Sequence, residues 1–160
     1  MRKAKSIHNI CVASIKRSTM KPYDFKWTKF YESNFDFPYV GLQIDLKEDE
    51  LFICSTVIDA DNFSILTTKQ LITKQDGQII SGDLEGATDK EYGDFKGYKD
   101  KSLTFGQVQL KNGIDLKYFI ETGKASMIMI HGVRTLIRTQ QMTDTQVDNV
   151  KRVWNRKNGE

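Results

Sequence analysis

Residues 103–137 read LTFGQVQLKNGIDLKYFIETGKASMIMIHGVRTLI and decide the class of the fold. Apolar and polar residues alternate over 103–110 and again over 114–120, which predicts two half-buried strands. The dipeptide Asn112-Gly113 between them favours a type I′ hairpin turn, because both of its residues tolerate positive φ. The alternation changes phase at Gly106, so a β-bulge is expected there.

After Gly123 the apolar residues follow a helical period. Their stripe leaves Arg134 and Arg138 outside it and consists of Met127, Ile130, Val133, Leu136 and Ile137. A last helix is expected from Thr143, which is spaced from Gln146 as in a capping box, with Val147, Val150 and Trp154 as its buried side. The hairpin is therefore followed by one or two helices.

The part of the chain before the hairpin supplies the other strands. Alternation over 39–46 predicts a half-buried strand, whereas 51–58 is apolar on both faces and predicts a strand covered on both sides. Further strands are expected at 63–67 and on either side of Asp76-Gly77, a strong hairpin signal. Residues 82–101 are rich in glycine and charge and are expected to form a loop with one short edge strand.

The N-terminal segment predicts an amphipathic helix over 4–20 that ends at or before Pro22. The order is then helix, about seven strands joined by short turns, and C-terminal helices, which indicates an α+β fold with an antiparallel sheet. One domain is expected over residues 1–160. Its parts are the helix and an aromatic segment (1–38), the strands (39–122) and the C-terminal helices (124–160).

This pattern resembles the bacterial form of the pleckstrin-homology-like fold over residues 39–140. Residues 63–72, FSILTTKQLI, are similar to a strand pattern of those domains in which threonine and a basic residue precede an apolar pair. The resemblance implies a strongly bent sheet, or partial barrel, closed by the C-terminal helix. Many such domains bind phosphoinositides, but the corresponding loop here is Lys47-Glu48-Asp49-Glu50, which would repel a phosphate headgroup. The resemblance therefore implies a scaffold for binding a protein or peptide.

Residues 23–39 contain eight aromatic side chains. Aromatic residues at this density could stack on nucleic-acid bases. They more often anchor an irregular segment to a core, because each ring buries a large apolar area. We favour the structural interpretation.

Composition places the chain among compact cytoplasmic proteins. It has 160 residues, 39% hydrophobic and 28% charged, with no apolar run long enough for a signal-peptide core or a membrane span. Two cysteines, Cys11 and Cys54, are too few for a disulfide framework, although a single bridge between them stays open.

No catalytic or metal-binding pattern emerges from the sequence. The two histidines and two cysteines lack zinc-finger spacing, and a thiol at Cys54 in an apolar strand is expected to be inert. Asp59 and Asp61 resemble the opening of a calcium loop, but its glycine and closing glutamate are absent. We expect no enzyme activity, no cofactor and no metal.

Charge is distributed unevenly along the chain. Residues 1–30 carry a net charge of +7, residues 31–123 carry −8 and residues 124–160 carry +4. In one interpretation, the positive charge of the two ends compensates the negative charge of the strand region at the surface of the same molecule. Alternatively, the acidic loops form a docking face for a basic partner.

From this charge pattern we expect a non-catalytic protein- or peptide-binding module, of an adaptor or immunity type. Contacts with an unidentified, basic partner are expected from the acidic loops 47–50 and 83–94, with the aromatic stretch 23–39 as an apolar anchor. The acidic residues expected to take part are Glu48, Asp49, Glu50, Asp89, Glu91 and Asp94. The alternative is binding to an anionic membrane, with Ile7, Ile10 and Ile15 inserted and with headgroup contacts from Arg2, Lys3, Lys5, Lys16 and Arg17. The acidic centre makes nucleic acid a less favoured partner.

Overall fold

The computed structural model describes residues 4–42 and 44–141. In this part of the chain, the α-helix α1 (Ala4–Ser18) precedes eight strands in the sequence, and the α-helix α2 (Ser126–Gln141) follows them. The strands are β1 (Thr28–Phe30), β2 (Phe52–Asp59), β3 (Asn62–Thr67), β4 (Leu71–Gln75), β5 (Gln78–Gly82), β6 (Thr88–Glu91), β7 (Leu103–Gln109) and β8 (Asp115–Glu121). The helix expected from Thr143 lies outside the described residues.

The strands form two antiparallel sheets in which neighbours in sequence are neighbours in space. One sheet has the order β1-β2-β3-β4-β5 and the other β6-β7-β8. Short turns join β2 to β5 in succession and β7 to β8, whereas longer segments join β1 to β2 and β6 to β7. The α+β class with antiparallel sheets and a C-terminal helix is confirmed, with eight described strands in place of about seven.

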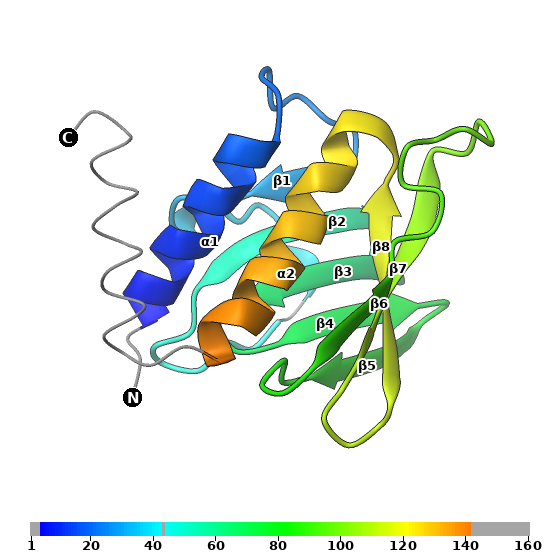
Figure 1. Cartoon of the computed structure of the whole chain (residues 1–160). Coiled ribbons are helices and arrows are strands. Elements are labelled where there is room, and N and C mark those ends of the chain that lie inside the picture. Colours follow the sequence, from blue (N-terminus) through cyan, green and yellow to red (C-terminus); the bar gives the residue numbers. More distant parts are fainter. Residues whose placement is uncertain (1–3, 43, 142–160) are drawn as a thin grey trace.

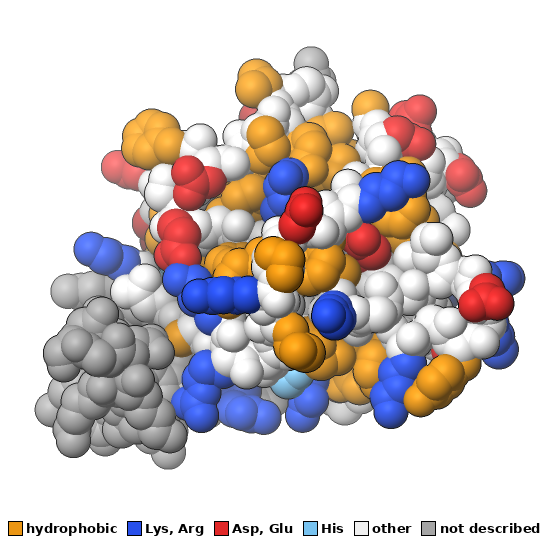
Figure 2. All heavy atoms as spheres, turned by 90° about the horizontal axis from the view of Figure 1, so that it is seen from above, with side chains coloured by type: hydrophobic (Ala, Val, Ile, Leu, Met, Phe, Trp, Pro, Cys, Tyr) orange, Lys and Arg blue, Asp and Glu red, His pale blue; other side chains and the backbone are white. Residues whose placement is uncertain are grey.

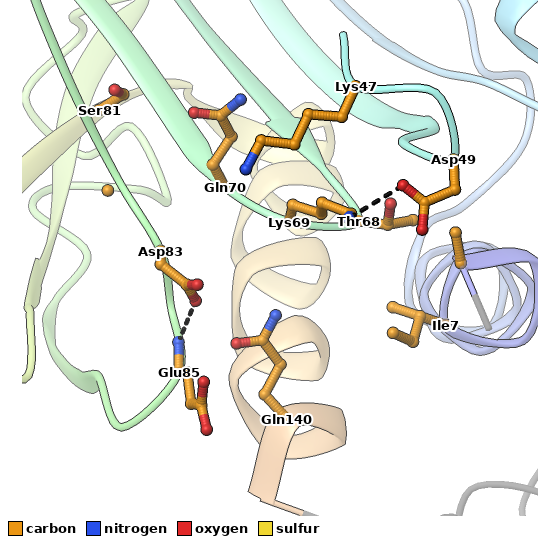
Figure 3. A pocket seen from close by; sticks show the side chains of 12 residues that line it. Ile7, Lys47, Asp49, Thr68, Lys69, Gln70, Ser81, Asp83, Glu85 and Gln140 are labelled. Atoms are coloured by element: carbon orange, nitrogen blue, oxygen red, sulfur yellow. Dashed lines mark hydrogen bonds and ion pairs between the residues drawn. The ribbon is translucent and has the colours of Figure 1, made fainter. Parts of the chain in front are cut away.

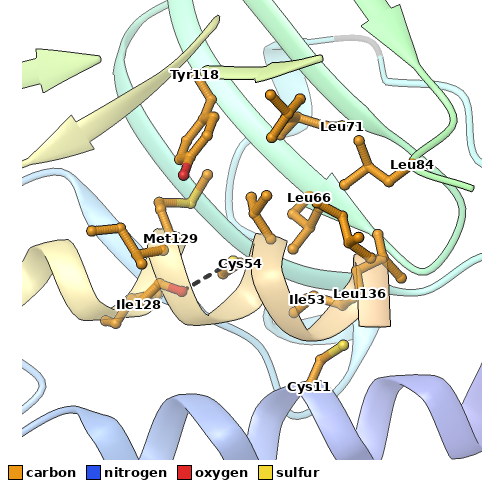
Figure 4. Close-up of a cluster of buried hydrophobic side chains, with 14 of the residues drawn as sticks. Cys11, Ile53, Cys54, Leu66, Leu71, Leu84, Tyr118, Ile128, Met129 and Leu136 are labelled. Carbon is orange, nitrogen blue, oxygen red and sulfur yellow. Dashed lines mark hydrogen bonds between the residues drawn. The ribbon is translucent and has the colours of Figure 1, made fainter. Parts of the chain in front are cut away.

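The two long helices lie side by side in opposite directions and cover the same face of the first sheet (Figure 1). Their apolar stripes meet the strands in one large buried cluster (Figure 4). Members from the helices and from both sheets are Cys11, Ile15, Cys54, Leu66, Tyr118, Met129 and Leu136. The apolar stripe of each amphipathic helix is therefore part of the core.

Gly132 is a position where α2 lies very close to the first sheet. A Cβ atom built on Gly132 would lie 2.8 Å from the Cys54 Sγ, 3.1 Å from a Leu66 methyl carbon and 3.4 Å from an Ile15 methyl carbon. These three atoms belong to β2, β3 and α1. The first two distances are shorter than ordinary contacts and the third is not, so a side chain at this position would push α2 away from the sheet.

The other face of the first sheet is covered by the aromatic segment. Phe37 stacks on Phe52 with ring centroids 3.8 Å apart, and Tyr31 packs edge-on against both rings. Tyr39, Leu42, Ile44 and Leu46 complete this second buried cluster. At these positions the aromatic side chains anchor an irregular segment to the core, as the sequence predicts.

The described residues of 39–46 do not form the strand that their alternation predicts. Val40–Leu42 is a 3₁₀ helix, and residues 44–47 have no regular secondary structure. Three of the alternating side chains, Leu42, Ile44 and Leu46, pack on the sheet without backbone pairing, whereas Val40 is exposed. A short strand, β1, lies in the aromatic segment, where none was expected.

The turns of the two hairpins differ. Asp76 and Gly77 have φ of 50° and 81°, so both occupy the left-handed region that a type I′ turn requires. At the second hairpin only Gly113 has positive φ, at 89°, and its N–H donates to the Leu110 carbonyl. The expectation of a type I′ turn at Asn112-Gly113 is therefore wrong.

The expected bulge at Gly106 is also absent. The pairing of β7 with β8 runs in continuous register from Leu103 opposite Glu121 to Gln109 opposite Asp115. A Cβ at Gly106 would lie 2.3 Å from the ring of Tyr118, its cross-strand partner. Glycine is needed here to make room for a tyrosine ring, and not to bend the strand.

We predict that Gly132→Ala destabilises the protein by about 1–2 kcal/mol, although alanine favours a helix over glycine by about 1 kcal/mol. Overpacking against the Cys54 Sγ and the Leu66 methyl carbon would outweigh that gain, since such insertions cost about 1–3 kcal/mol. Denaturant unfolding measures the difference. Gly41→Ala is the matched control, because its Cβ would meet nothing within 4 Å. Equal stability of the two variants would contradict the packing.

Candidate functional site

Two acidic loops that are far apart in the sequence meet at one cleft of about 540 Å³ (Figure 3). Lys47 and Asp49 come from the loop before β2, and Asp83 and Glu85 follow β5. The floor and ends are formed by the β3–β4 turn, the start of α1 and the end of α2. These parts contribute Ala4, Ile7, Thr68, Lys69, Gln70 and Gln140.

Glu50 anchors the first acidic loop. Its side chain is buried, and its carboxyl oxygens accept hydrogen bonds from the Lys47 backbone N–H at 3.1 Å and the Gln70 side-chain amide at 3.0 Å. The Thr67 hydroxyl donates to the same carboxyl group. Glu50 therefore joins the loop to the β3–β4 turn and is not part of an exposed acidic face.

The exposed acids of the cleft differ in their partners. Asp49 pairs with Lys69 across 2.9 Å, and this hydrogen bond lowers the pKa of Asp49. Asp83 accepts the backbone N–H of Glu85 at 2.8 Å. Neither Asp83 nor Glu85 forms an ion pair with another residue that the structure describes. Their negative charge is available to a molecule that enters the cleft.

Three other acids were selected from the sequence. Asp89 and Glu91 lie on β6 in the second sheet, and Asp94 lies in the loop that follows β6. Glu91 is exposed. The Asp94 carboxylate accepts the backbone N–H groups of Tyr98 and Lys99 and so shapes its own loop. Asp89 is half-buried and faces Arg134 of α2, with its Oδ2 at 3.7 Å from the arginine Nε. The structure thus separates these acids from the cleft.

Asp89 belongs to a partly buried polar cluster between β6, β8 and α2. Burial raises the pKa of Asp89, and burial together with the nearby Asp89 raises that of Tyr118. Within the described residues, the Tyr118 hydroxyl and the Asp89 Oδ1 have no hydrogen-bond partner. The sequence gives no signal for this cluster, because its members are brought together only by the crossing of the helix over the second sheet.

The basic N-terminal helix does not expose its apolar side. Ile7, Ile10 and Ile15 are only 7%, 2% and 0% exposed, because α1 packs on α2 and the sheet. Lys5, Lys16 and Arg17 lie at the surface, with Lys16 paired to Glu32, whereas Arg2 and Lys3 lie outside the described residues. Insertion of the isoleucines into a membrane would require α1 to leave the core.

Neither the cysteines nor His8 belongs to a group of metal ligands among the described residues. Cys11 and Cys54 are free and fully buried, and burial raises the pKa of both thiols. His8 bonds the Tyr31 carbonyl oxygen at 2.8 Å through its Nε2. Among residues 4–42 and 44–141, no group of three or more metal-ligating side chains is close enough to hold an ion. Asp59 closes the β2–β3 turn by accepting the Asp61 N–H.

One aromatic residue of the N-terminal segment faces solvent completely. Phe35 is 100% exposed on a short 3₁₀ helix, Asn34–Asp36, which Ser33 caps through a hydrogen bond to the Phe35 N–H. A hollow of about 610 Å³ is lined by both Phe35 and Asp49, so this ring lies on the far side of the first acidic loop from the cleft. The hydrogen bond fixes the backbone at Phe35, and the ring itself is fully accessible to a partner.

Comparisons with known proteins identify no relative. No family model matches this chain, and neither a curated protein nor a solved structure does. No described helix combines the length and the apolar composition needed to cross a membrane. The functional assignment therefore depends on the geometry of the cleft itself.

We predict that Glu50→Ala destabilises the protein by about 2–3 kcal/mol, because it leaves buried donors without an acceptor. Thermal or denaturant unfolding would measure the loss. Glu48→Ala, two residues away on the exposed part of the same loop, should change stability by less than about 0.5 kcal/mol. A Glu50→Ala variant as stable as the wild type would show that the carboxyl group does not anchor the loop.

Proposed function

We propose that this protein is a non-catalytic module that binds a basic segment of a partner protein at the cleft between loops 47–49 and 83–85. The observation that carries the proposal is the convergence of two acidic loops on one open hollow. Asp83 and Glu85 lie there without an ion-pair partner among the described residues. Lysine and arginine side chains of a partner would be attracted to this charge.

The rigidity of the cleft supports this role. The first loop is tied down by Glu50, and the second leaves β5 through the short turn at Asp83 and Glu85. A preformed site loses little conformational entropy when a ligand binds. Phe35, on the other side of Asp49, extends the surface with an apolar anchor. A partner segment with basic residues followed by an apolar side chain fits both features.

We also propose that the scaffold is related to the pleckstrin-homology-like fold. The meander of antiparallel strands in two sheets, followed by a C-terminal helix packed against them, supports this relationship. The helix α1, which packs beside α2, would be an addition to that fold, and the segment 35–46 would be a second one. On this scaffold the cleft would include loop 47–50, which corresponds to the phosphoinositide-binding loop of such domains but is acidic here.

We predict that Asp83→Asn combined with Glu85→Gln weakens binding of a fluorescein-labelled lysine- and arginine-rich peptide by about tenfold. Two partly exposed charge contacts account for a loss of this size. Fluorescence anisotropy at low and at moderate salt measures it, and salt should weaken wild-type binding more than that of the variant.

The matched control is Glu91→Gln with Asp115→Asn, which removes the same charge from exposed positions on the second sheet. This variant should bind the peptide as the wild type does. An equal loss in both variants would show that only net charge matters, and a loss in the control alone would place the site on the second sheet. Either result would overturn the assignment to the cleft.

A further inference from the structure

A second hollow, of about 690 Å³, lies where α1 ends and β1 begins. Its volume is in the range of small-molecule sites, which is about 300–1,000 Å³. The charged side chains around it are mostly basic, with Lys16, Arg17, Lys21 and Lys29 against two acids. One of the acids, Glu32, is already paired with Lys16. This hollow is therefore opposite in charge to the acidic cleft.

Lys21 and Lys29 provide the charge that a ligand could use. Both are exposed, and neither forms an ion pair with another described residue. They come from different segments, the loop after α1 and strand β1, and reach the same hollow. Two ammonium groups around one hollow favour a ligand group with a double negative charge, such as a phosphate monoester at neutral pH.

The same hollow has an aromatic wall. Tyr23 and Phe30 are half-buried and meet edge to face, with ring centroids 4.9 Å apart. Ile128, near the start of α2, also lines the hollow but is completely buried. Figure 2 shows this end of the molecule, where Lys and Arg side chains lie next to exposed hydrophobic ones. A flat ring would find apolar and aromatic surface here.

We propose that this hollow binds a small aromatic phosphate monoester, the class to which mononucleotides belong. The phosphate contacts Lys21 and Lys29, and the ring packs against Tyr23 and Phe30. A phosphate ion alone would contact only the two lysines, and an aromatic ring alone would contact only the two aromatic side chains. The site is independent of the acidic cleft, because the two hollows share no lining residue.

Isothermal titration calorimetry with adenosine 5′-monophosphate, adenosine and inorganic phosphate tests the proposal. The monophosphate should bind at least about tenfold more tightly than either fragment, since affinity from both halves combines. Lys21→Ala with Lys29→Ala should weaken its binding by about tenfold. The control, Lys99→Ala with Lys101→Ala, removes the same charge from an exposed loop and should bind normally.

Three results would overturn the proposal. The first is monophosphate binding no tighter than that of inorganic phosphate, which would leave only a general attraction to anions. The second is an equal loss of binding in the control variant. The third concerns vesicles of phosphatidylcholine and phosphatidylserine. If they bind the wild type but not the Lys21/Lys29 variant, and the monophosphate does not displace them, the hollow recognises a lipid headgroup.

Discussion

At Gly132 the helix α2 packs closely on the first sheet, and this packing positions one wall of the candidate binding site. A Cβ atom here would press against atoms of β2 and β3, whereas the Ile15 methyl carbon of α1 would lie at an ordinary contact distance. Glycine at this position therefore sets the distance of α2 from the first sheet. Because Gln140 of α2 and residues 68–70 of the β3–β4 turn line the acidic cleft, this packing also affects the width of the candidate binding site.

Acidic residues in this protein have two different roles, which depend on burial. Glu50 is buried and hydrogen-bonded, so it contributes to the position of the loop. Asp83 and Glu85 stay in solvent and contribute negative potential to the cleft. Asp89 and Asp94 interact within the protein, with Arg134 and with backbone N–H groups. The excess of acid over residues 31–123 is thus partly structural and partly available to a partner.

The sequence predicts most strands well, because their periodicity and turn signals are local. Residues 51–58 and the hairpin around Asp76-Gly77 appear close to where they were expected. Residues 39–46 are misread, since side chains that pack on a sheet can alternate without backbone pairing. Gly106 is misread for another reason: the Tyr118 ring that requires glycine there lies on a different strand. For the site, the sequence identifies the acidic loops but cannot tell buried Glu50 from exposed Asp83, because burial follows from tertiary contacts.

We propose that the cleft between loops 47–49 and 83–85 receives a basic partner segment. An NMR titration of the ¹⁵N-labelled protein with the lysine- and arginine-rich peptide tests this location. Amide shift changes should be largest in residues 47–49, 68–70 and 81–85. Shift changes spread evenly over exposed acids, or centred on β6 and the loop that follows it, would contradict binding in the cleft.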